Sequence, residues 1–422
     1  MIVQIEKVTR VRAHFNAPPS KSLTHRAFIT ASLGVGDSVI RRPLQAADTA
    51  ITRDSLTRWG VPIEETKDGV LIKGCAGVLR CGGNSRIDVR DSGTSMRFLT
   101  SLALLCKTTV ILEGSPRMHE RPIGPLVQAL NILGAHITYQ GKEGYPPLRI
   151  SGSFRGGEVV VSGRESSQFI SSLLLASPYA EEDVTITCPE IPVSRSYIDS
   201  TLSVMDRFGA SFEHREYTWY RVKAGMPYRG TDFTVEGDWS SSAYFLAIPA
   251  VCGGTVSVHG LDPDSTQGDR LFLDSLVAMG CSVRWENGSV SVSKESALTG
   301  IHIDMSSAPD IVPILCVVAA CANTPSILTG VRHLRLKESD RIRAISDMLR
   351  VCGAGVETED DSITIIPAPL HGGVIDPRND HRIVMSAAIL GLGTGGITVL
   401  HAECVNKSFP AFWSMLQEAG LG

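Results

Sequence analysis

The hydrophobic positions of this chain follow a pattern that recurs six times. Each copy opens with a small polar or charged cluster, followed by an apolar stretch long enough for a helix. The copies begin at Ser20, Asp91, Glu165, Asp238, Ala308 and Asn379. Their start-to-start spacings are 71, 74, 73, 70 and 71 residues. Intervals this even indicate an internal repeat of one structural unit.

The same elements follow each polar cluster. The first helix is apolar nearly all round, as in residues 98–105, and this predicts a buried helix. A second helix has its apolar residues on one face, as in 121–135, which is typical of a surface position. In 340–354 the apolar positions of this second helix are Ile342, Ile345, Met348 and Leu349.

Short strands are expected around these helices. A β-branched run follows each buried helix, at 37–40, 108–112, 183–187, 254–258, 326–330 and 396–400. Two further strand-like runs end the repeat, and in 281–293 the dipeptide Asn287-Gly288 predicts a hairpin turn between them. Each repeat is therefore predicted as helix, strand, helix, strand, strand.

This order predicts an α/β protein in which sheets and outer helices surround buried helices. Six repeats make two domains of three repeats each. The sixth repeat reaches Gly422 before its final strand pair, whereas residues 1–17 form a strand pattern with no repeat of their own. We therefore expect a first domain at 19–236, and a second domain at 237–422 that residues 1–18 complete.

Length alone indicates two or three domains. A chain of 422 residues is too long for one ordinary core. Glycine contributes 40 residues, about 9.5% against a typical ~7%, and so favours many short elements. A net charge of −4 argues against a duplex-nucleic-acid binder.

The chain carries no signal for a membrane or for secretion. Its longest nearly unbroken apolar run is 311–322, shorter than the ~18 residues that a span requires. Four charged side chains within the first twelve residues argue against a secretory signal. Ten cysteines are scattered, and Cys106, Cys252, Cys316 and Cys321 occupy apolar positions as buried thiols do. We expect a reduced, cytoplasmic protein.

Candidate chemistry gathers at the starts of the helices. Free N–H groups and the helix dipole make the start of a helix an anion site, but the dipole contributes only ~0.3–1 kcal/mol, so cations must assist. Cations stand there at Lys21, Arg26, Arg97, Arg121, Lys337, Arg341, His381, Arg382 and Lys407. We expect one or two phosphates or carboxylates to bind between the domains.

A purely structural interpretation competes at some of these positions. Ser92, Asp238 and Ser240 are expected to be N-caps, and Glu338 and Asp340 could merely favour the start of a helix. Because several such clusters recur at the same period, we favour an anion-binding site over N-capping alone. The glycine-rich 391–396 leads from helix to strand, so it is not a dinucleotide loop. The histidines lack the spacing of paired ligands, and no metal site is expected.

Seven motifs together carry a resemblance. In chain order they are PPSKSLTHRA, DSGTSMRF, RMHERPIG, ESSQF, KESDR, NDHR and NKSFP. From Lys21 to Lys407 the chain resembles the 5-enolpyruvylshikimate-3-phosphate synthase family. The resemblance implies two domains of three βαβαββ units, described as an inside-out α/β barrel, with the active site in the cleft between the domains. It also implies transfer of the carboxyvinyl group of phosphoenolpyruvate to the 5-hydroxyl of shikimate-3-phosphate, without a cofactor, by a monomer.

The resemblance further implies site residues. Lys21 would contact both substrates. The shikimate-3-phosphate contacts would be Ser22, Arg26, Ser166, Ser167, Gln168, Ser194, Tyr197 and Lys337. The phosphoenolpyruvate contacts would be Gly93, Arg121, Gln168, Arg341, Arg382 and Lys407. Asp310 and Glu338 resemble the acid–base carboxylates of the family, with Asp310 at the hydroxyl, and Glu338, assisted by Lys21, at C3 and the leaving phosphate.

Two positions depart from the family pattern. Asp91 and His333 stand where many members of the family have asparagine. An acidic side chain is unexpected near a phosphate, so we expect either that Asp91 points away from the phosphate site or that Arg97 pairs with Asp91. Gly93 implies sensitivity to glyphosate.

The nearest alternative function is that of the related transferase that acts on UDP-N-acetylglucosamine, but the segment around Arg121 lacks the cysteine typical of that enzyme. A non-catalytic repeat scaffold and an RNA-end-processing enzyme are further alternatives.

Overall fold

The sequence repeat corresponds to a structural repeat of two helices and a small sheet. The structure, a computed structural model, describes residues 1–83 and 85–421. Its strands form six sheets, one for each repeat; five have four strands and one has three. The helix, strand, helix, strand, strand order predicted from the hydrophobic pattern is confirmed in the first five repeats, and among the described residues the sixth lacks the final strand pair, as expected.

The first compact unit, Pro19–Val235, holds three repeats. The first repeat contains α1 (Lys21–Leu33), β3 (Asp37–Arg41), α2 (Ala47–Arg58), β4 (Ile63–Thr66) and β5 (Gly69–Lys73). The second contains β6 (Ser85–Asp88), α3 (Gly93–Leu102), β7 (Val110–Glu113), α4 (Gly124–Ile132), β8 (Ala135–Tyr139) and β9 (Leu148–Gly152). The third contains β10 (Gly157–Val160), α5 (Gln168–Ala176), β11 (Val184–Thr187), α6 (Ser196–Arg207), β12 (Phe212–Arg215) and β13 (Trp219–Val222).

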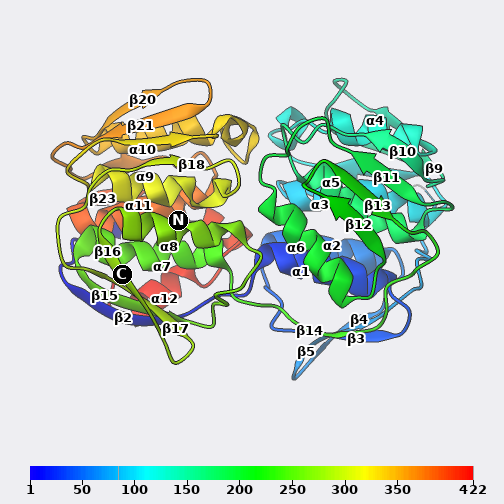
Figure 1. The fold of residues 1–422 in the computed structure, drawn as a ribbon, viewed down its shortest axis with the longest axis horizontal. Coiled ribbons are helices and arrows are strands. Elements are labelled where there is room, and N and C mark those ends of the chain that lie inside the picture. Colours follow the sequence, from blue (N-terminus) through cyan, green and yellow to red (C-terminus); the bar gives the residue numbers. More distant parts are fainter. Residues whose placement is uncertain (84, 422) are drawn as a thin grey trace. The chain divides into compact units, whose positions relative to one another are not determined.

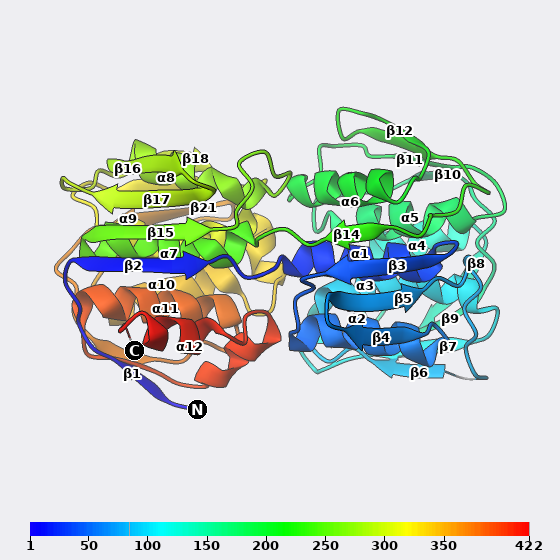
Figure 2. The same ribbon diagram turned by 90° about the horizontal axis from the view of Figure 1, so that it is seen from below.

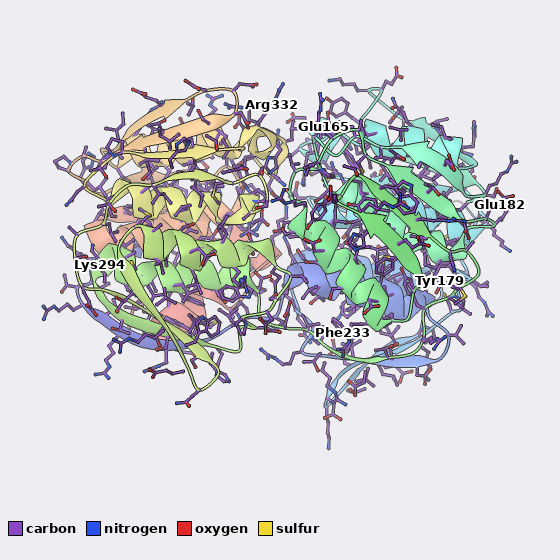
Figure 3. The ribbon with its side chains drawn as sticks, viewed as in Figure 1. Glu165, Tyr179, Glu182, Phe233, Lys294 and Arg332 are labelled. Carbon is purple, nitrogen blue, oxygen red and sulfur yellow. A yellow bond between two sulfur atoms is a disulfide. The ribbon has the colours of Figure 1, made fainter. Side chains whose placement is uncertain are left out.

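A late strand completes the first repeat. β14 (Asp232–Thr234) pairs in parallel with β3, and this register places Phe233, which is labelled in Figure 3, opposite Ile40. In the other two repeats the parallel partner comes first along the chain, as β6 does for β7. All three sheets of this unit therefore have the βαβαββ composition.

The second compact unit joins Met1–Pro18 to Glu236–Gly422. Its first repeat contains β2 (Val11–Asn16), α7 (Trp239–Cys252), β15 (Gly254–His259), α8 (Leu271–Ala278), β16 (Cys281–Glu286) and β17 (Ser289–Lys294). Its second contains β18 (His302–Asp304), α9 (Val312–Ala320), β19 (Ser326–Thr329), α10 (Arg341–Val351), β20 (Gly355–Thr358) and β21 (Ser362–Ile366). Its third contains β1 (Val3–Ile5), β22 (Gly373–Ile375), α11 (His381–Thr394), β23 (Ile397–Val399) and α12 (Phe412–Glu418).

The N-terminal segment supplies two strands to this unit rather than the single strand expected. β1 pairs antiparallel with β23. β2 pairs parallel with β15, and Figure 2 shows these two strands side by side. The predicted hairpin turn is present between β16 and β17, where Asn287 and Gly288 have φ of 51° and 73°. Short 3-10 helices connect other elements: η1 (Ala103–Cys106), η2 (Met118–Glu120), η3 (Ser177–Tyr179), η4 (Gly268–Arg270), η5 (Pro309–Ile311), η6 (Arg332–Leu336) and η7 (Ala402–Lys407).

The first helix of each repeat is buried, as predicted. In the second unit α7, α9 and α11 pack on one another, with the sheets around them (Figure 1). Hydroxyl groups on buried helices donate to their own helix: in the first unit Thr30 donates to the Arg26 carbonyl at 3.0 Å and Thr100 to the Met96 carbonyl at 2.7 Å. Such bonds satisfy many of the polar residues that line these helices. Within the described residues, Nε2 of His25 and the hydroxyls of Ser32, Ser242 and Ser386 have no hydrogen-bond partner.

Among the second helices, α10 has the predicted apolar face, whereas the buried face of α2 is mostly polar, with Asp48, Thr49, Thr52 and Ser55 beside Leu56. On α10 the four apolar positions predicted from the sequence are all buried, whereas Arg343 and Val351 are exposed. The helices of the described residues are too short or too polar to cross a membrane.

The cysteines differ from the expectation of a fully reduced chain. Cys81 and Cys106 form a disulfide, so the prediction of a free, buried thiol at Cys106 is wrong. The reason is tertiary: the loop after β5 returns to the end of α3, which places the two residues 5.3 Å apart at Cα. Cys316 is a buried free thiol, and burial raises its pKa, but Cys252 and Cys321 are only partly buried.

Candidate active site

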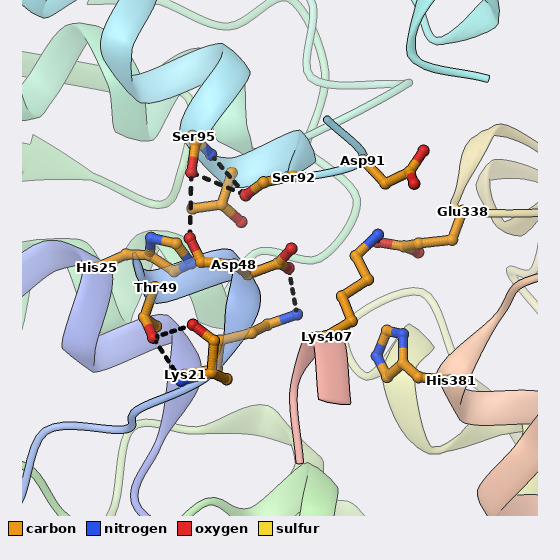
Figure 4. Close-up of polar contacts among 12 residues, drawn as sticks. Lys21, His25, Asp48, Thr49, Asp91, Ser92, Ser95, Glu338, His381 and Lys407 are labelled. Carbon is orange, nitrogen blue, oxygen red and sulfur yellow. Dashed lines mark hydrogen bonds and ion pairs between the residues drawn. The ribbon is translucent and has the colours of Figure 1, made fainter. Parts of the chain in front are cut away.

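The start of α1 holds the first expected cation. Ser20 is the N-cap, and its hydroxyl accepts from the Leu23 amide at 3.5 Å. Lys21 follows, and its Nζ lies 3.4 Å from the Asp48 carboxylate on α2 (Figure 4). Both side chains are largely buried, at 14% and 5% exposure. The ammonium group is therefore held in one place at the start of the helix.

Arg26, one turn further along α1, is almost completely buried. Its Nε donates to Thr201 at 2.8 Å, Nη1 to the Ser22 carbonyl at 2.9 Å, and Nη2 to the Tyr197 carbonyl at 2.8 Å. Its guanidinium also lies over the Phe98 ring, 5.1 Å from the centroid. Burial lowers the pKa of Arg26 to about 10. These contacts bring three predicted substrate residues, Ser22, Arg26 and Tyr197, into one cluster.

At the start of α3 a glycine faces an arginine. Ser92 is the N-cap, as predicted, and accepts from the Ser95 amide at 3.3 Å. A Cβ on Gly93 would lie 2.7 Å from Cζ of Arg121, so the guanidinium occupies the space that a side chain would need. Arg121 is 6% exposed, and its Nη1 donates to the Asp91 carbonyl at 3.3 Å. The structure therefore brings Gly93 and Arg121 together.

Asp91 has a local partner in the same loop. The Ser115 hydroxyl donates to its carboxylate. In Figure 4 this carboxylate points away from Ser92 and Ser95. Arg97 donates to the Pro122 carbonyl at 2.7 Å and so supports the segment that carries Arg121. The orientation agrees with the alternative in which Asp91 points away from the start of α3.

The start of α5 lies against the start of α3. Nε2 of Gln168 donates to the Thr94 hydroxyl at 3.0 Å, and the Ser166 hydroxyl accepts from the Gln168 amide at 3.2 Å. Ser167, the N-cap residue, is 2% exposed. Ser194 is buried just before α6, with a positive φ of 55°. The first unit thus collects polar side chains from four helix starts.

In the second unit one arginine pairs with three carboxylates. Arg341 donates from Nε to Asp380 at 2.9 Å, from Nη1 to Asp310 at 2.9 Å and from Nη2 to Glu338 at 2.6 Å. The side chain is only 2% exposed. Burial alone would lower its pKa, but Asp380, Glu338 and Asp310 hold the pKa above its ordinary value. Such a charge is stable in the interior only because it is paired.

A second arginine holds the other side of Asp310. Nη2 of Arg382 lies 2.5 Å from Oδ2 of Asp310, while Arg341 contacts Oδ1. Arg382 also donates to the Ser240 hydroxyl at 3.1 Å, and that hydroxyl lies 2.6 Å from the Asp238 carboxylate. Asp238 is the N-cap of α7, as predicted, but Ser240 is not a cap: it is the second residue of the helix and connects the cap to Arg382.

Glu338 also pairs with Lys407, which adds a further cation to this cluster. Nζ of Lys407 lies 3.6 Å from Oε1 of Glu338, and each side chain is 12% exposed (Figure 4). Asp310 is 18% exposed. Lys337 precedes Glu338 and is partly buried. All five second-unit residues predicted to act on phosphoenolpyruvate or protons lie together: Asp310, Glu338, Arg341, Arg382 and Lys407.

His333 is buried beside this cluster. Burial, reinforced by the charge of Lys337, lowers its pKa to about 3. The imidazole is therefore neutral at physiological pH, as the amide of the asparagine common in the resembled family is. Within residues 1–83 and 85–421, no group of three or more histidine, cysteine, aspartate or glutamate side chains is placed to hold a metal ion.

Two carboxylates escaped the sequence analysis. Asp48 pairs with Lys21, and Asp380 caps α11 while it accepts from Arg341 and from Ser339 at 3.0 Å. The only available signal was position, since each lies at the start of a helix in a repeat. Their partners are 27 and 39 residues away along the chain, and periodicity does not identify such pairs.

Comparison with known proteins gives the family. The sequence model of the family described as EPSP synthase (3-phosphoshikimate 1-carboxyvinyltransferase) matches residues 5–416. The chain belongs to the EPSP synthase family. It is similar to the 3-phosphoshikimate 1-carboxyvinyltransferases of Methanoculleus marisnigri, with 52% identity over 100% of both chains, and Methanoregula boonei, with 50% identity over 99% of both.

A solved EPSP synthase has the same fold. The structure of the enzyme from Acinetobacter baumannii superposes with a TM-score of 0.83 at 30% identity, covering 100% of this chain and 98% of that chain. The inside-out α/β architecture expected from the resemblance is confirmed by this similarity. The matched relatives carry the name of the shikimate-3-phosphate enzyme, which decides against the UDP-N-acetylglucosamine and scaffold alternatives.

Proposed function

We propose that the polar clusters of the two units bind and activate the substrates of EPSP synthase chemistry. The chain transfers the enolpyruvyl group of phosphoenolpyruvate to the 5-hydroxyl of shikimate-3-phosphate and releases phosphate, a step of aromatic amino acid biosynthesis. The observation that carries the site assignment is the pairing of Arg341 and Arg382 on opposite oxygens of Asp310.

The cations account for substrate binding. Both substrates carry phosphate, and phosphoenolpyruvate carries a carboxylate as well. We assign that carboxylate to Arg341 and Arg382, because a planar guanidinium can pair with it bidentately. Gly93, Arg121, Gln168 and Lys407 complete the phosphoenolpyruvate contacts.

Shikimate-3-phosphate is assigned to the residues around α1, α5 and α6. Arg26 is held by three hydrogen bonds, and its position favours a fixed anion contact. The proposed contacts are Lys21, Ser22, Arg26, Ser166, Ser167, Gln168, Ser194, Tyr197, Asp310 and Lys337.

Proton transfer is assigned to two carboxylates and a lysine. The 5-hydroxyl attacks C2 of phosphoenolpyruvate and loses its proton to Asp310, while C3 gains a proton. The tetrahedral intermediate then loses a C3 proton as the bond from C2 to the phosphate oxygen breaks. We assign the steps at C3 and the leaving phosphate to Glu338, assisted by Lys21. A positioned acid or base of this kind contributes ~10²–10⁴-fold to the rate.

A phosphate-release assay tests the function. Release from phosphoenolpyruvate should require shikimate-3-phosphate, and UDP-N-acetylglucosamine should not replace it. Asp310→Ala should lose at least ~100-fold in kcat, and unchanged turnover would overturn the assignment of Asp310. We further propose that the enzyme is monomeric and cytoplasmic and needs no cofactor. Sedimentation measures its oligomeric state, and an activity assay after chelation tests whether it needs a bound metal ion.

A further inference from the structure

A row of buried hydrogen bonds joins α1, α2 and α3 of the first unit. Nδ1 of His25, on α1, lies 2.8 Å from the Thr52 hydroxyl on α2. That hydroxyl lies 2.9 Å from Oγ of Ser95 on α3. Ser95 Oγ lies 2.8 Å from Oγ of Ser92, the N-cap of the same helix. We call these four residues the hydroxyl row.

The hydroxyl row is shielded from water. His25, Thr52, Ser92 and Ser95 each have 0% exposure. Water cannot replace a partner that is lost there, so breaking one hydrogen bond leaves a buried polar group unsatisfied, which is unfavourable. The row therefore constrains how the three helices pack, because each hydrogen bond requires a defined distance between its donor and acceptor.

Each end of the hydroxyl row adjoins a residue proposed to bind substrate. His25 lies one helical turn after Lys21, on the same face of α1. At the other end, Ser92 directly precedes Gly93. The row thus connects the lysine proposed to contact both substrates with the glycine proposed to contact phosphoenolpyruvate.

A further contact connects the hydroxyl row to Lys21 through Asp48. Ser95 Oγ also lies 3.5 Å from the carbonyl oxygen of Asp48, whose carboxylate pairs with Lys21 (Figure 4). The ammonium group of Lys21 and the start of α3 are therefore tied to the same turn of α2.

His25 is neutral in this setting. Burial, then the charges of Lys21 and Arg26, lower its pKa well below the ordinary value. Its Nε2 has no hydrogen-bond partner. A neutral ring with the proton on Nδ1 leaves only an acceptor unpaired, whereas the other tautomer would bury an unpaired N–H. We therefore assign the proton to Nδ1, which donates to Thr52 and leaves the Thr52 hydroxyl free to donate to Ser95.

We propose that His25 is a positioning residue for phosphoenolpyruvate binding. As the donor at one end of the hydroxyl row, it holds the start of α3, with Gly93, in register with Lys21 on α1. His25 acts through other residues and touches no reacting atom. The inference rests on the proposed function, because its effect is measured on that reaction.

Steady-state kinetics on matched variants test the proposal. In His25→Leu the KM for phosphoenolpyruvate should rise about fivefold, the effect of roughly 1 kcal/mol, while kcat changes less than twofold. His25→Asn should restore a KM within about twofold of wild type, since its amide can donate from the position of Nδ1. Thr52→Val should raise the KM like His25→Leu, and Thr52→Ser should not.

A control on the same helix separates positioning from stability. Thr30→Val also removes a buried hydroxyl from α1, but that hydroxyl bonds only to carbonyls of its own helix. It should lower the melting temperature without changing the KM. If His25→Leu does not fold, the comparison of Thr52→Val with Thr52→Ser tests the proposal.

The outcomes distinguish this inference from the proposed function. A wild type that turns over, with an unchanged KM in Thr52→Val, would overturn the positioning role alone. An equal KM rise in Thr30→Val, or no rescue by His25→Asn, would overturn it as well. A wild type that releases no phosphate in the presence of shikimate-3-phosphate would overturn the proposed function and this inference together.

Discussion

Gly93 is a glycine because Arg121 occupies the place of its side chain. A Cβ at Gly93 would come within 2.7 Å of both Cζ and Nη1 of Arg121. The backbone of Gly93 is helical, so the requirement for glycine comes from this close approach and not from an unusual φ. Arg121 is itself nearly buried, so it has little room to move aside.

We predict that Gly93→Ala weakens phosphoenolpyruvate binding. The methyl group must displace the guanidinium of Arg121, so the KM for phosphoenolpyruvate should rise about tenfold, equivalent to ~1.4 kcal/mol. Inhibition by glyphosate, which the family resemblance leads us to expect in the wild type, should weaken in parallel. Gly82→Ala is the matched control, because a Cβ there meets nothing within 4 Å. A wild type indifferent to millimolar glyphosate would contradict the expected sensitivity.

Arg341→Lys should damage both stability and activity. Lysine keeps the charge but cannot reach Asp310, Glu338 and Asp380 in three directions, so carboxylates buried around it lose partners. We expect a loss of about 2–3 kcal/mol in the free energy of unfolding, measured in urea, and a fall of at least tenfold in kcat/KM. Arg343→Lys, two residues on and 67% exposed, should change neither. Equal behaviour of the two variants would argue against the three-carboxylate cluster.

His333 should make stability depend on pH. Its pKa in the folded chain, about 3, lies below the value of ~6.5 expected after unfolding. Between these values the unfolded chain binds a proton that the native chain does not, so stability falls as the pH falls from about 6.5 toward 3. His333→Asn should flatten the dependence by up to ~1.4 kcal/mol per pH unit.

Urea unfolding at pH 7 and pH 5 measures the effect of His333. His136→Asn, at an exposed position on β8, serves as the control and should follow the wild type. The prediction fails if His333→Asn keeps the full wild-type slope.

The disulfide should stabilise the start of the second repeat. Cys106 follows Cys81 by 25 positions along the chain, and α3 with Gly93 lies between them. Closing a loop of this length stabilises the folded state relative to the unfolded chain by about 3.5 kcal/mol. Dithiothreitol should therefore lower the melting temperature of the wild type. Cys81→Ser should have a lower melting temperature than the wild type without dithiothreitol, and the reagent should not change it. Cys75→Ser, which removes a free thiol nearby, should respond like the wild type. Alkylation of both Cys81 and Cys106 without a reductant would show that the bond is absent.

Much of the fold could be predicted because it is local. The buried positions of α10 follow a 3.6-residue period, and the turn at Asn287-Gly288 follows from the left-handed backbone that these residues tolerate. The even spacing of six polar clusters gave the repeat and its two groups of three. The second N-terminal strand could not be predicted, because β1 finds its partner β23 almost 400 residues away.

The sequence allowed us to predict which residues belong to the candidate site, but not which of them pair with one another. Motifs and resemblance pointed to Asp310, Glu338, Arg341, Arg382 and Lys407, which the structure places in one cluster. They did not show that Arg341 and Arg382 hold opposite oxygens of Asp310, or that Asp380 is the third carboxylate of Arg341. Ser240 was mistaken for a cap because its contact with Arg382 spans 142 residues.

The sequence by itself determined the repeat, the burial of the first helix of each repeat and the kind of ligand. These properties depend on hydrophobic period and on the free N–H groups and cations at helix starts, which lie close together along the chain. Only the tertiary structure decided which charges pair, where Cys81 meets Cys106, and that His25 joins α1, α2 and α3 through buried hydroxyls. Such contacts depend on distances between elements that packing sets, and no local pattern records them.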